Sequence, residues 1–286
     1  MWIIFACLSA FFAGITAVIS KCGIKTTDSS LATALRTIVI IIFSWLIVVI
    51  VGSFNTITTI ENKTLLFIIL SGLSTGASWI CYFKALQLGS VNKVVPIDKS
   101  STILTIILAI IFFNEGFSIL KLCAIILISL GIYLMIEKKD VTYQTNHKNW
   151  IIYALLSAIF ASLTAILGKM GISNIESNLG TAIRTSVVLI MAWILVFMTG
   201  KTKNLKHINR NELFFIFLSG ITTGASWLCY YNALQNGTTS VVVAIDKLSI
   251  IVTVIFSYFA FKERLSKKSF LGLMLLIGGT ILLAII

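Results

Sequence analysis

Charged side chains occur at matching positions inside long apolar stretches of the sequence. Three such positions each occur twice: Arg36 and Arg184, Asp98 and Asp246, Lys99 and Lys247. An ionised side chain inside a bilayer costs about 3 kcal/mol on insertion scales, so such residues seldom face lipid and often mark ion or solute pathways. Arg and Lys donate hydrogen bonds to anionic groups, whereas Asp accepts them or binds a proton. These residues therefore predict a polar binding or coupling site within a membrane.

The matching positions lie 148 residues apart because the chain is one unit written twice. Segments 71–101 and 219–249 share 19 identical residues in 31 positions, which is too many to result from similar composition. Each copy contains five apolar segments. Because five is odd, the second copy must enter the bilayer in the opposite orientation. An inverted repeat with charged residues at matching depths is typical of secondary transporters.

The composition excludes an ordinary soluble domain. Hydrophobic residues make up 58% and charged residues 11% of the chain, whereas soluble domains are about half apolar and a quarter charged. The formal charge of +12 arises largely from cations at the ends of apolar segments, which predicts contact with anionic lipid and no nucleic-acid partner. The five cysteines form no Cys-x-x-Cys pair and the two histidines lie in polar connections, so we predict no metal site and no cofactor.

We predict an all-α integral membrane protein with ten transmembrane helices, arranged as two inverted repeats of five. A spanning segment must satisfy its own backbone hydrogen bonds, so each is expected to be a helix. The expected helices lie near residues 2–20, 31–51, 64–86, 92–113, 118–136, 150–168, 179–199, 212–235, 240–261 and 269–286. The repeats are expected at 1–137 and 150–286, joined by the polar connection 138–149.

The distribution of cations predicts the orientation of the chain. The odd-numbered connections carry fourteen Lys and Arg residues and the even-numbered connections carry three. The positive-inside rule then places the odd connections in the cytoplasm and both termini on the extracytoplasmic side of the cell membrane. The excess of cations also falls on different connections in the two halves, because connection 201–210 is basic while its match at 53–62 is not.

Small and aromatic residues mark the third segment of each copy. Small residues four apart share a helix face and allow close helix packing or sliding, and they occur as Gly72 with Gly76 and Gly220 with Gly224. The next turn holds two sets of polar and aromatic residues: Ser78, Trp79 and Tyr82, then Ser226, Trp227 and Tyr230. Two interpretations are open for these sets, namely lining a solute cavity and packing in the bundle core. Pro96 has no match in the second copy and predicts a kink beside Asp98.

The charged residues also admit two interpretations. Arg36 and Asp98 are expected at similar depths, as are Arg184 and Asp246 at the mirrored depth, so each pair either joins two helices or guards one side of a cavity. Neighbouring residues on a helix point about 100° apart, so each Asp is expected to be a poor partner for the Lys that follows it. One excess positive charge per cluster favours a carboxylate-bearing or zwitterionic solute. Glu115 and Glu263 end apolar segments and are expected at the membrane interface.

The repeated strings resemble the EamA domain of the drug/metabolite transporter superfamily. They are A-L-R-T, G-A-S-W followed by Y-x-A-L, and V-V-x-I-D-K-x-S, and the resemblance covers nearly the whole chain twice. It implies two EamA repeats in a ten-helix basket, a central cavity, alternating access, and export of amino acids, other metabolites or toxic organic compounds. The membrane glutamate of small multidrug-resistance relatives has no counterpart in residues 2–20, so Asp98 and Asp246 are the candidates for coupling to protons or another ion.

We therefore predict a secondary active exporter of a small molecule, and not an enzyme. No phosphate-binding loop and no G-x-S-x-G or H-E-x-x-H cluster is present. The alternatives are a passive channel or scramblase, and an intramembrane enzyme that uses two acids. Inversion is expected to separate Asp98 from Asp246 by roughly 12 Å along the membrane normal, which disfavours the enzyme. A monomer and a homodimer are both compatible with the sequence.

Overall fold

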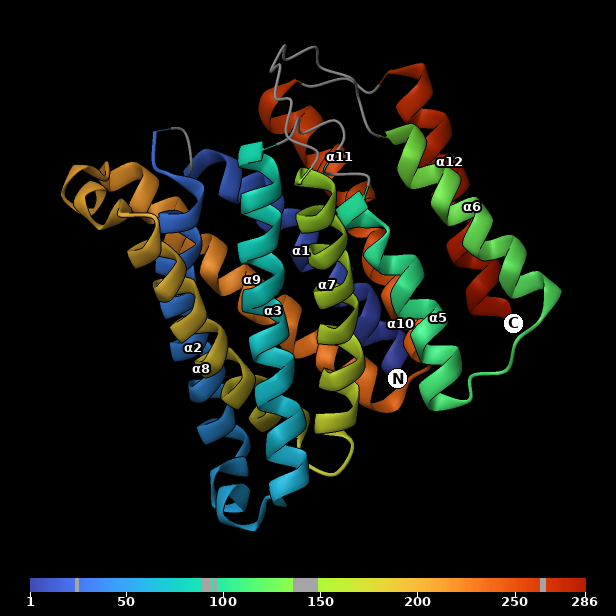
Figure 1. Ribbon diagram of the computed structural model, residues 1–286, viewed down its shortest axis with the longest axis horizontal. Coiled ribbons are helices and arrows are strands. Elements are labelled where there is room, and N and C mark those ends of the chain that lie inside the picture. The colour runs from blue at the N-terminus through green and yellow to red at the C-terminus, as the bar shows by residue number, and fades with distance from the viewer. Residues whose placement is uncertain (24–25, 89–93, 95–96, 136–148, 263–265) are drawn as a thin grey trace.

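The computed structural model describes residues 1–23, 26–88, 94, 97–135, 149–262 and 266–286, and these residues are mostly helical (Figure 1). The α-helices are α1 (Trp2–Gly23), α2 (Ser29–Val51), α3 (Asn62–Leu88), α5 (Ser101–Phe113), α6 (Ile119–Met135), α7 (Trp150–Ile172), α8 (Ser177–Met198), α9 (Arg210–Asn236), α10 (Thr239–Lys247), α11 (Ser249–Phe261) and α12 (Lys267–Ile285). Two short 3-10 helices, η1 (Ser53–Thr59) and η2 (Lys201–His207), lie in the connections after α2 and α8, and the sequence did not predict them.

The chain is an all-α integral membrane protein. Eight segments of the described residues are helices that are long and apolar enough to cross a membrane, and α10 with α11 forms one of them. The helix α6 is apolar but has only 17 residues, and α5 is the main described part of the expected span 92–113. Large apolar side chains cover the outer surface, with Ile42, Val49 and Phe197 all more than 60% exposed. A surface of this kind is stable against lipid and not against water.

One predicted helix is interrupted in the structure. Segment 240–261 contains two helices, α10 and α11, and the N–H of Leu248 between them donates to the carbonyl of Ile245 at 2.9 Å. At the matching position, the N–H of Ser100 donates to the carbonyl of Ile97 at 3.1 Å. Both bonds span three residues instead of four, which tightens the turn. Each interruption follows directly after an Asp-Lys pair, so each pair lies at a helix end and not in a regular helix.

Other backbone features also recur 148 residues apart. Asp28 caps the first turn of α2, and Glu176 caps the first turn of α8 through the same two amide positions. Gly52 and Gly200 follow α2 and α8 with φ of +79° and +66°, a conformation that favours glycine. The repeat in the sequence is therefore a repeat in local structure.

The two halves pack against each other by exchanging equivalent contacts. Helix α1 packs on α9 as α3 packs on α7, while α2 packs on α8 and α6 on α12. Following the colour along the chain in Figure 1, α1, α3 and α6 rise in the view, and their matches α7, α9 and α12 descend. Both termini lie toward the lower side of the view, with η1 at the lower end and η2 at the upper end. The largest buried cluster draws residues from both halves, including Ile106, Ile128, Val242 and Leu276.

The four small residues predicted to pack closely lie at helix crossings. Gly72 and Gly76 of α3 face α8, and Gly220 and Gly224 of α9 face α2. A Cβ atom at Gly72 would lie 2.7 Å from the Cβ of Val187, and one at Gly220 would lie 2.6 Å from the Cβ of Val39. No real Cβ tolerates such a distance, so glycine sets how closely these helices approach.

Candidate functional site

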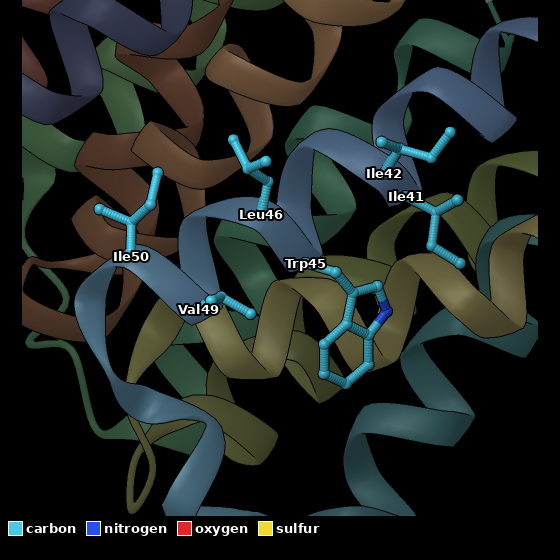
Figure 2. A pocket seen from close by; sticks show the side chains of 6 residues that line it. All are labelled: Ile41, Ile42, Trp45, Leu46, Val49 and Ile50. Carbon is cyan, nitrogen blue, oxygen red and sulfur yellow. The ribbon is translucent and has the colours of Figure 1, made fainter.

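The large groove on the outer face of α2 is not a candidate for the polar site. It has a volume of about 530 Å³ and is lined by Ile41, Ile42, Trp45, Leu46, Val49 and Ile50, as Figure 2 shows. The only nitrogen among these side chains, Nε1 of Trp45, donates to Oγ of Ser186 at 3.3 Å. Because the lining is apolar and largely exposed, this groove belongs to the surface that faces lipid. The polar groups gather elsewhere, between the two halves.

In the second half, Asp246 lies near the end of α10 and accepts a hydrogen bond from α1. Oγ of Ser9 donates to Oδ1 of Asp246 at 3.3 Å. Oγ of Ser226, on α9, donates to the backbone carbonyl of Ser9 at 3.0 Å, and the two hydroxyl oxygens are 3.4 Å apart. Ser9 is fully buried and Ser226 nearly so. The acid is thus held by two serines from two other helices.

The first half repeats this arrangement around Asp98. Oγ of Ser157, on α7, donates to Oδ1 of Asp98 at 2.8 Å. Oγ of Ser78, on α3, donates to the carbonyl of Ser157 at 3.0 Å, and the two hydroxyl oxygens are 3.3 Å apart. Each Ser–Ser–Asp triad therefore takes one serine from the half that does not contain its acid.

The sequence analysis missed Ser9 and Ser157, although the signal was present. These serines lie 148 residues apart, so the repeat itself pairs them. A single serine in an apolar helix commonly bonds its own backbone, so its presence alone does not indicate a site. Here each one donates to a carboxylate instead.

The two Asp-Lys pairs share one electrostatic environment. The charge of Lys99 interacts with those of Asp98, Asp246 and Lys247, and α10 packs against α5. The expectation that each Asp is a poor partner for the next Lys is wrong for the second pair, because Nζ of Lys247 lies 3.4 Å from Oδ2 of Asp246. Lys247 ends α10, and its four-carbon stem is long enough to fold back at a helix end.

The predicted pairing of arginine with aspartate does not occur between the described residues. Arg36 and Arg184 bind hydroxyl groups, and no ion pair joins either of them to Asp98 or Asp246. The expectation placed residues by depth alone. In the structure α2 packs against α8 and α9, whereas α5, directly after Asp98, packs against α7 and α10, so these residues lie in different parts of the bundle.

Arg184 is buried among hydroxyl groups and aromatic rings, with 4% of its surface exposed. Its Nε donates to Oγ of Ser71 at 3.1 Å, and its Nη2 donates to Oγ1 of Thr75 at 2.6 Å. The guanidinium carbon lies 5.0 Å from the ring centre of Trp227 and 4.8 Å from that of Tyr231. Both distances are within the range of cation–π attraction.

Arg36 occupies the matching position on α2 but has a more open environment. Its Nη1 donates to Oγ of Ser20 at 2.8 Å, and its Nη2 lies 3.5 Å from Oγ1 of Thr33. Beside it is a cavity of about 70 Å³ lined by Ser20, Ser29, Ala32, Thr33, Arg36, Ile216 and Ser219. A water molecule occupies about 30 Å³ of the liquid, so this cavity has room to hydrate the guanidinium.

The predicted aromatic residues divide between the two interpretations. Trp79 packs in a cluster between α2 and α8 that includes Leu31 and Ala192. Tyr82 packs against a second cluster that includes Ala85 and Ala154. Tyr230 packs on the central core, with its ring 5.3 Å from that of Tyr231. The ring of Trp227 lies over the guanidinium of Arg184. The predicted kink at Pro96 and the site of Glu263 lie outside the described residues.

Glu115 joins the two halves at the end of the bundle where α10 begins, and Lys169 makes a contact within the second half at the same end. The carboxylate of Glu115 accepts from the N–H groups of Thr239 and Ser240 and from the hydroxyl of Ser240. Nζ of Lys169 donates to the carbonyl of Gly237 at 2.5 Å. A carboxylate at a helix N-terminus binds free amides and the positive end of the helix dipole. Glu115 therefore fixes the start of α10, the helix that contains Asp246.

At the opposite end, Asp28 joins the connection after α1 to η2 of the second half. Nζ of Lys201 lies 2.7 Å from Oδ2 of Asp28, and both side chains are between a quarter and a third exposed. Burial raises the pKa of Asp28, but the hydrogen bond and charge of Lys201 and the amides of Ser30 and Leu31 outweigh it. The pKa of Asp28 therefore lies below its ordinary value.

Known proteins match this chain along most of its length. A model of the EamA-like transporter family matches residues 1–137 and again residues 148–285. An uncharacterized transporter in the cobO 3' region of Sinorhizobium sp is 40% identical over 138 residues, which are 48% of this chain and 98% of that protein. The uncharacterized transporter YxxF of Bacillus subtilis is 26% identical over 208 residues, covering 71% of this chain and 64% of that protein.

The fold also has a solved counterpart. One crystal structure of a protein superposes with a TM-score of 0.80, covering 98% of this chain and 95% of the other. The two sequences are only 12% identical, so this similarity concerns the fold alone.

Proposed function

Because the chain belongs to the EamA-like transporter family of the drug/metabolite transporter superfamily, we propose that it is a secondary active transporter that exports small metabolites such as amino acids, or toxic organic compounds. Export proceeds by alternating access through a central cavity between the two halves. The protein resides in the cell membrane with both termini on the extracytoplasmic side. Membership of the family makes it a membrane transporter, and the solute class and direction are the proposed part.

The proposed architecture has ten transmembrane helices in two inverted repeats, 1–137 and 150–286, joined by 138–149. Three observations support it. Helix caps and positive-φ residues recur 148 positions apart, equivalent contacts are exchanged between the halves, and matching helices run in opposite directions in Figure 1. Such a pair has a central site that faces either side when one half rocks against the other.

The observation that carries the proposal is the pair of Ser–Ser–Asp triads at two interrupted helices. A break in a membrane helix is tolerated where the freed groups line a cavity or are buried in protein, and solute and ion sites of transporters are built at such breaks. Asp98 and Asp246 are the coupling acids in this proposal, and Lys99 and Lys247 lie beside them to balance or bind charge. Each acid accepts from a serine of the opposite half, so rocking the halves changes the environment of both acids.

The ends of the bundle supply contacts that must open in turn. At the predicted extracytoplasmic end, Glu115 of the first half binds the first turn of α10. At the predicted cytoplasmic end, Lys201 of the second half binds Asp28. Both sets cross between the halves, so each holds one end closed. Alternating access requires that one set breaks while the other remains.

The same geometry bears on the alternative of an intramembrane enzyme. The estimated separation of about 12 Å between the acids rested on the rise of two regular helices. Both helices are interrupted beside their acids, and both acids interact with Lys99. The separation of about 12 Å therefore does not distinguish a transporter from an intramembrane enzyme. Membership of the EamA-like family favours transport over catalysis. Each acid accepts a hydrogen bond from a serine and lies close to a lysine.

Flux through proteoliposomes tests the proposal. Purified protein is reconstituted with an imposed pH gradient, and a panel of labelled amino acids, quaternary amines and organic acids is offered. We expect at least one solute to accumulate against its own gradient, which a passive channel or scramblase does not achieve. Asp98→Asn and Asp246→Asn should each lower this flux about tenfold, a change that needs only about 1.4 kcal/mol at the rate-limiting step.

Glu61→Gln serves as the matched control, because Glu61 is an exposed acid at the start of α3. It should transport like the unmodified protein. Full flux in both aspartate variants would reduce these acids to structural groups, and equilibration without accumulation would favour the channel.

A further inference from the structure

Arg184 carries a buried positive charge that no described acidic side chain neutralises. Its surface is 4% exposed. Among the described residues, ion pairs join Lys201 to Asp28 and Lys247 to Asp246, and neither pair includes Arg184. An uncompensated buried charge is strongly unfavourable, and charged residues kept inside membrane helices usually serve a solute or ion.

One corner of the guanidinium also lacks a hydrogen-bond partner. Nε and Nη2 donate to Ser71 and Thr75, but Nη1 is buried and has no acceptor in the part of the chain that the structure describes. Nη1 carries two N–H donors. Hydroxyl oxygens accept hydrogen bonds but bring no negative charge. The surroundings of Arg184 thus supply acceptors for two nitrogens and a counter-charge for none.

The two aromatic residues next to the guanidinium differ in burial. Tyr231 is 2% exposed and belongs to the central core. Trp227 is only half-buried, so its indole separates Arg184 from a more open region. Trp227 lies on α9, whose glycine face packs against α2. A change of the Trp227 rotamer would uncover Nη1 while Tyr231, on the same helix, keeps its place.

We propose that Arg184 binds the carboxylate of the transported solute, which places that solute among small monocarboxylates. This inference rests on the proposed transport function. In the bound state, Nη1 donates to one carboxylate oxygen, and the indole of Trp227 moves aside to pack on the apolar part of the solute. A single carboxylate matches the single unbalanced charge. A phosphate dianion would replace one excess charge with another of opposite sign.

The matching arginine explains why only one of the two is assigned this role. Arg36 lies beside a polar cavity of about 70 Å³, which has room to hydrate its charge but not to hold a metabolite. Arg184 lies within cation–π distance of two aromatic rings. A cation that water does not hydrate has more to gain from an anionic ligand.

Ligand binding to the purified full-length protein in detergent tests this assignment without requiring transport. The probes are carboxylates paired with their uncharged amides, at constant ionic strength: phenylacetate with phenylacetamide, isovalerate with isovaleramide, and N-acetylphenylalanine with its amide. Inorganic phosphate is a further probe. The readouts are the midpoint of thermal unfolding and tryptophan fluorescence, to which Trp227 contributes. At least one carboxylate is expected to raise the midpoint and change the fluorescence, while its amide does neither.

Arg184→Gln is expected to weaken carboxylate binding about tenfold or more, as befits loss of a charge-assisted hydrogen bond. Its unliganded midpoint should be unchanged or raised, because the substitution removes an unbalanced buried charge. A purely structural arginine would instead lower the midpoint. Lys203→Gln, which removes an exposed cation from η2, should bind like the unmodified protein. If Arg184→Gln does not yield folded protein, Arg184→Lys keeps the charge and should keep the preference for carboxylate over amide.

Three results would overturn the assignment: no carboxylate in the panel binds, amides bind as tightly as carboxylates, or Arg184→Gln binds carboxylate normally. Protection by phosphate equal to that by carboxylate would refute the solute class. Failure of the transport proposal looks different, because carboxylate would then bind through Arg184 without accumulating in vesicles. Accumulation of an amine that is insensitive to Arg184→Gln would instead preserve the transport function and refute the assignment.

Discussion

The carboxylate of Glu212 provides the most direct measure of how firmly the two halves are joined at the predicted cytoplasmic end. Glu212 lies in the first turn of α9, is 6% exposed, and reaches across to the connection between α1 and α2. Its Oε1 accepts from the N–H and hydroxyl of Thr26 at 3.1 and 2.8 Å. Its Oε2 accepts from the N–H and hydroxyl of Thr27 at 2.9 and 2.6 Å. Substitution of Glu212 by Gln alters all four bonds with little change in shape.

The expected loss follows from these four bonds. In Glu212→Gln, one oxygen becomes an amide NH2, which cannot accept from a backbone N–H, while the other keeps its two bonds without the negative charge. The threonine hydroxyl facing the NH2 can rotate and accept. The net change is therefore one lost charge-assisted bond and a weaker second pair, or about 2 kcal/mol of unfolding free energy. A loss of this size shifts the folded-to-unfolded ratio by a factor near the upper end of about 5 to 30.

Thermal unfolding in detergent, followed by intrinsic tryptophan fluorescence, measures this loss. Glu61→Gln makes the same chemical change at an exposed glutamate at the start of α3, and it should leave the midpoint unchanged. Glu212→Gln should lower the midpoint by several degrees relative to that control. Equal midpoints for the two variants would show that the four bonds contribute nothing beyond what water supplies, and the reasoning would fail.

Three further predictions concern other contacts between the halves. Gly220→Leu should destabilise the protein by about 1–3 kcal/mol through overpacking, because a Cβ at this position meets Val39. Gly278→Leu is the control in the same unfolding assay and should be tolerated, because a Cβ at Gly278 meets open space. Asp28→Asn should lower the free energy of unfolding by about 1 kcal/mol at neutral pH. Because the pKa of Asp28 is depressed in the folded state, the variant and the unmodified protein should differ fully in stability above the ordinary pKa of Asp, and the difference should vanish as pH falls through the folded-state pKa. A difference in stability that persists in acid would contradict the assignment to Lys201. Glu115→Gln should loosen the first turn of α10. A cysteine introduced at the buried Thr239 should then react faster with an impermeant maleimide that is added outside the cell. Labelling from the cytoplasmic side alone would refute the predicted orientation.

The sequence predicted the all-α membrane character of the fold well, because that character depends on the length and apolarity of the segments. The glycine positions were also readable, since residues four apart on a helix share a face and Gly72 and Gly220 recur together. Most predicted helix ends lie within a few residues of those observed. The interruption at Leu248 was not predicted, because no Gly or Pro marks it in segment 240–261 and its cause is a change from four-residue to three-residue hydrogen bonding.

The partners of the charged residues were much harder to predict. Depth along a helix gives one coordinate, and a side-chain contact requires three. Arg36 and Asp98 were matched by depth, yet their helices have different neighbours. The serines that bind the acids were visible only as a repeated spacing, and the bond from Lys247 to Asp246 depends on a helix end. These features are set by helix packing across the halves, which one sequence does not encode as a local pattern.

The differences between the two halves have a physical explanation in the fusion of the repeat. The Sinorhizobium relative is matched along 98% of its length by 48% of this chain, so a single copy of the unit exists as a protein. Two identical copies must supply identical residues to both ends of a pair. In the fused chain, Glu212 matches Thr64, Tyr231 matches Phe83 and Ala244 matches Pro96. The first difference joins the halves at one end only, and the second gives a hydroxyl group to the ring that packs on Arg184. Fusion thus allows one arginine to lie beside a polar cavity while the other is enclosed, which two identical copies related by symmetry could achieve only by adopting different conformations.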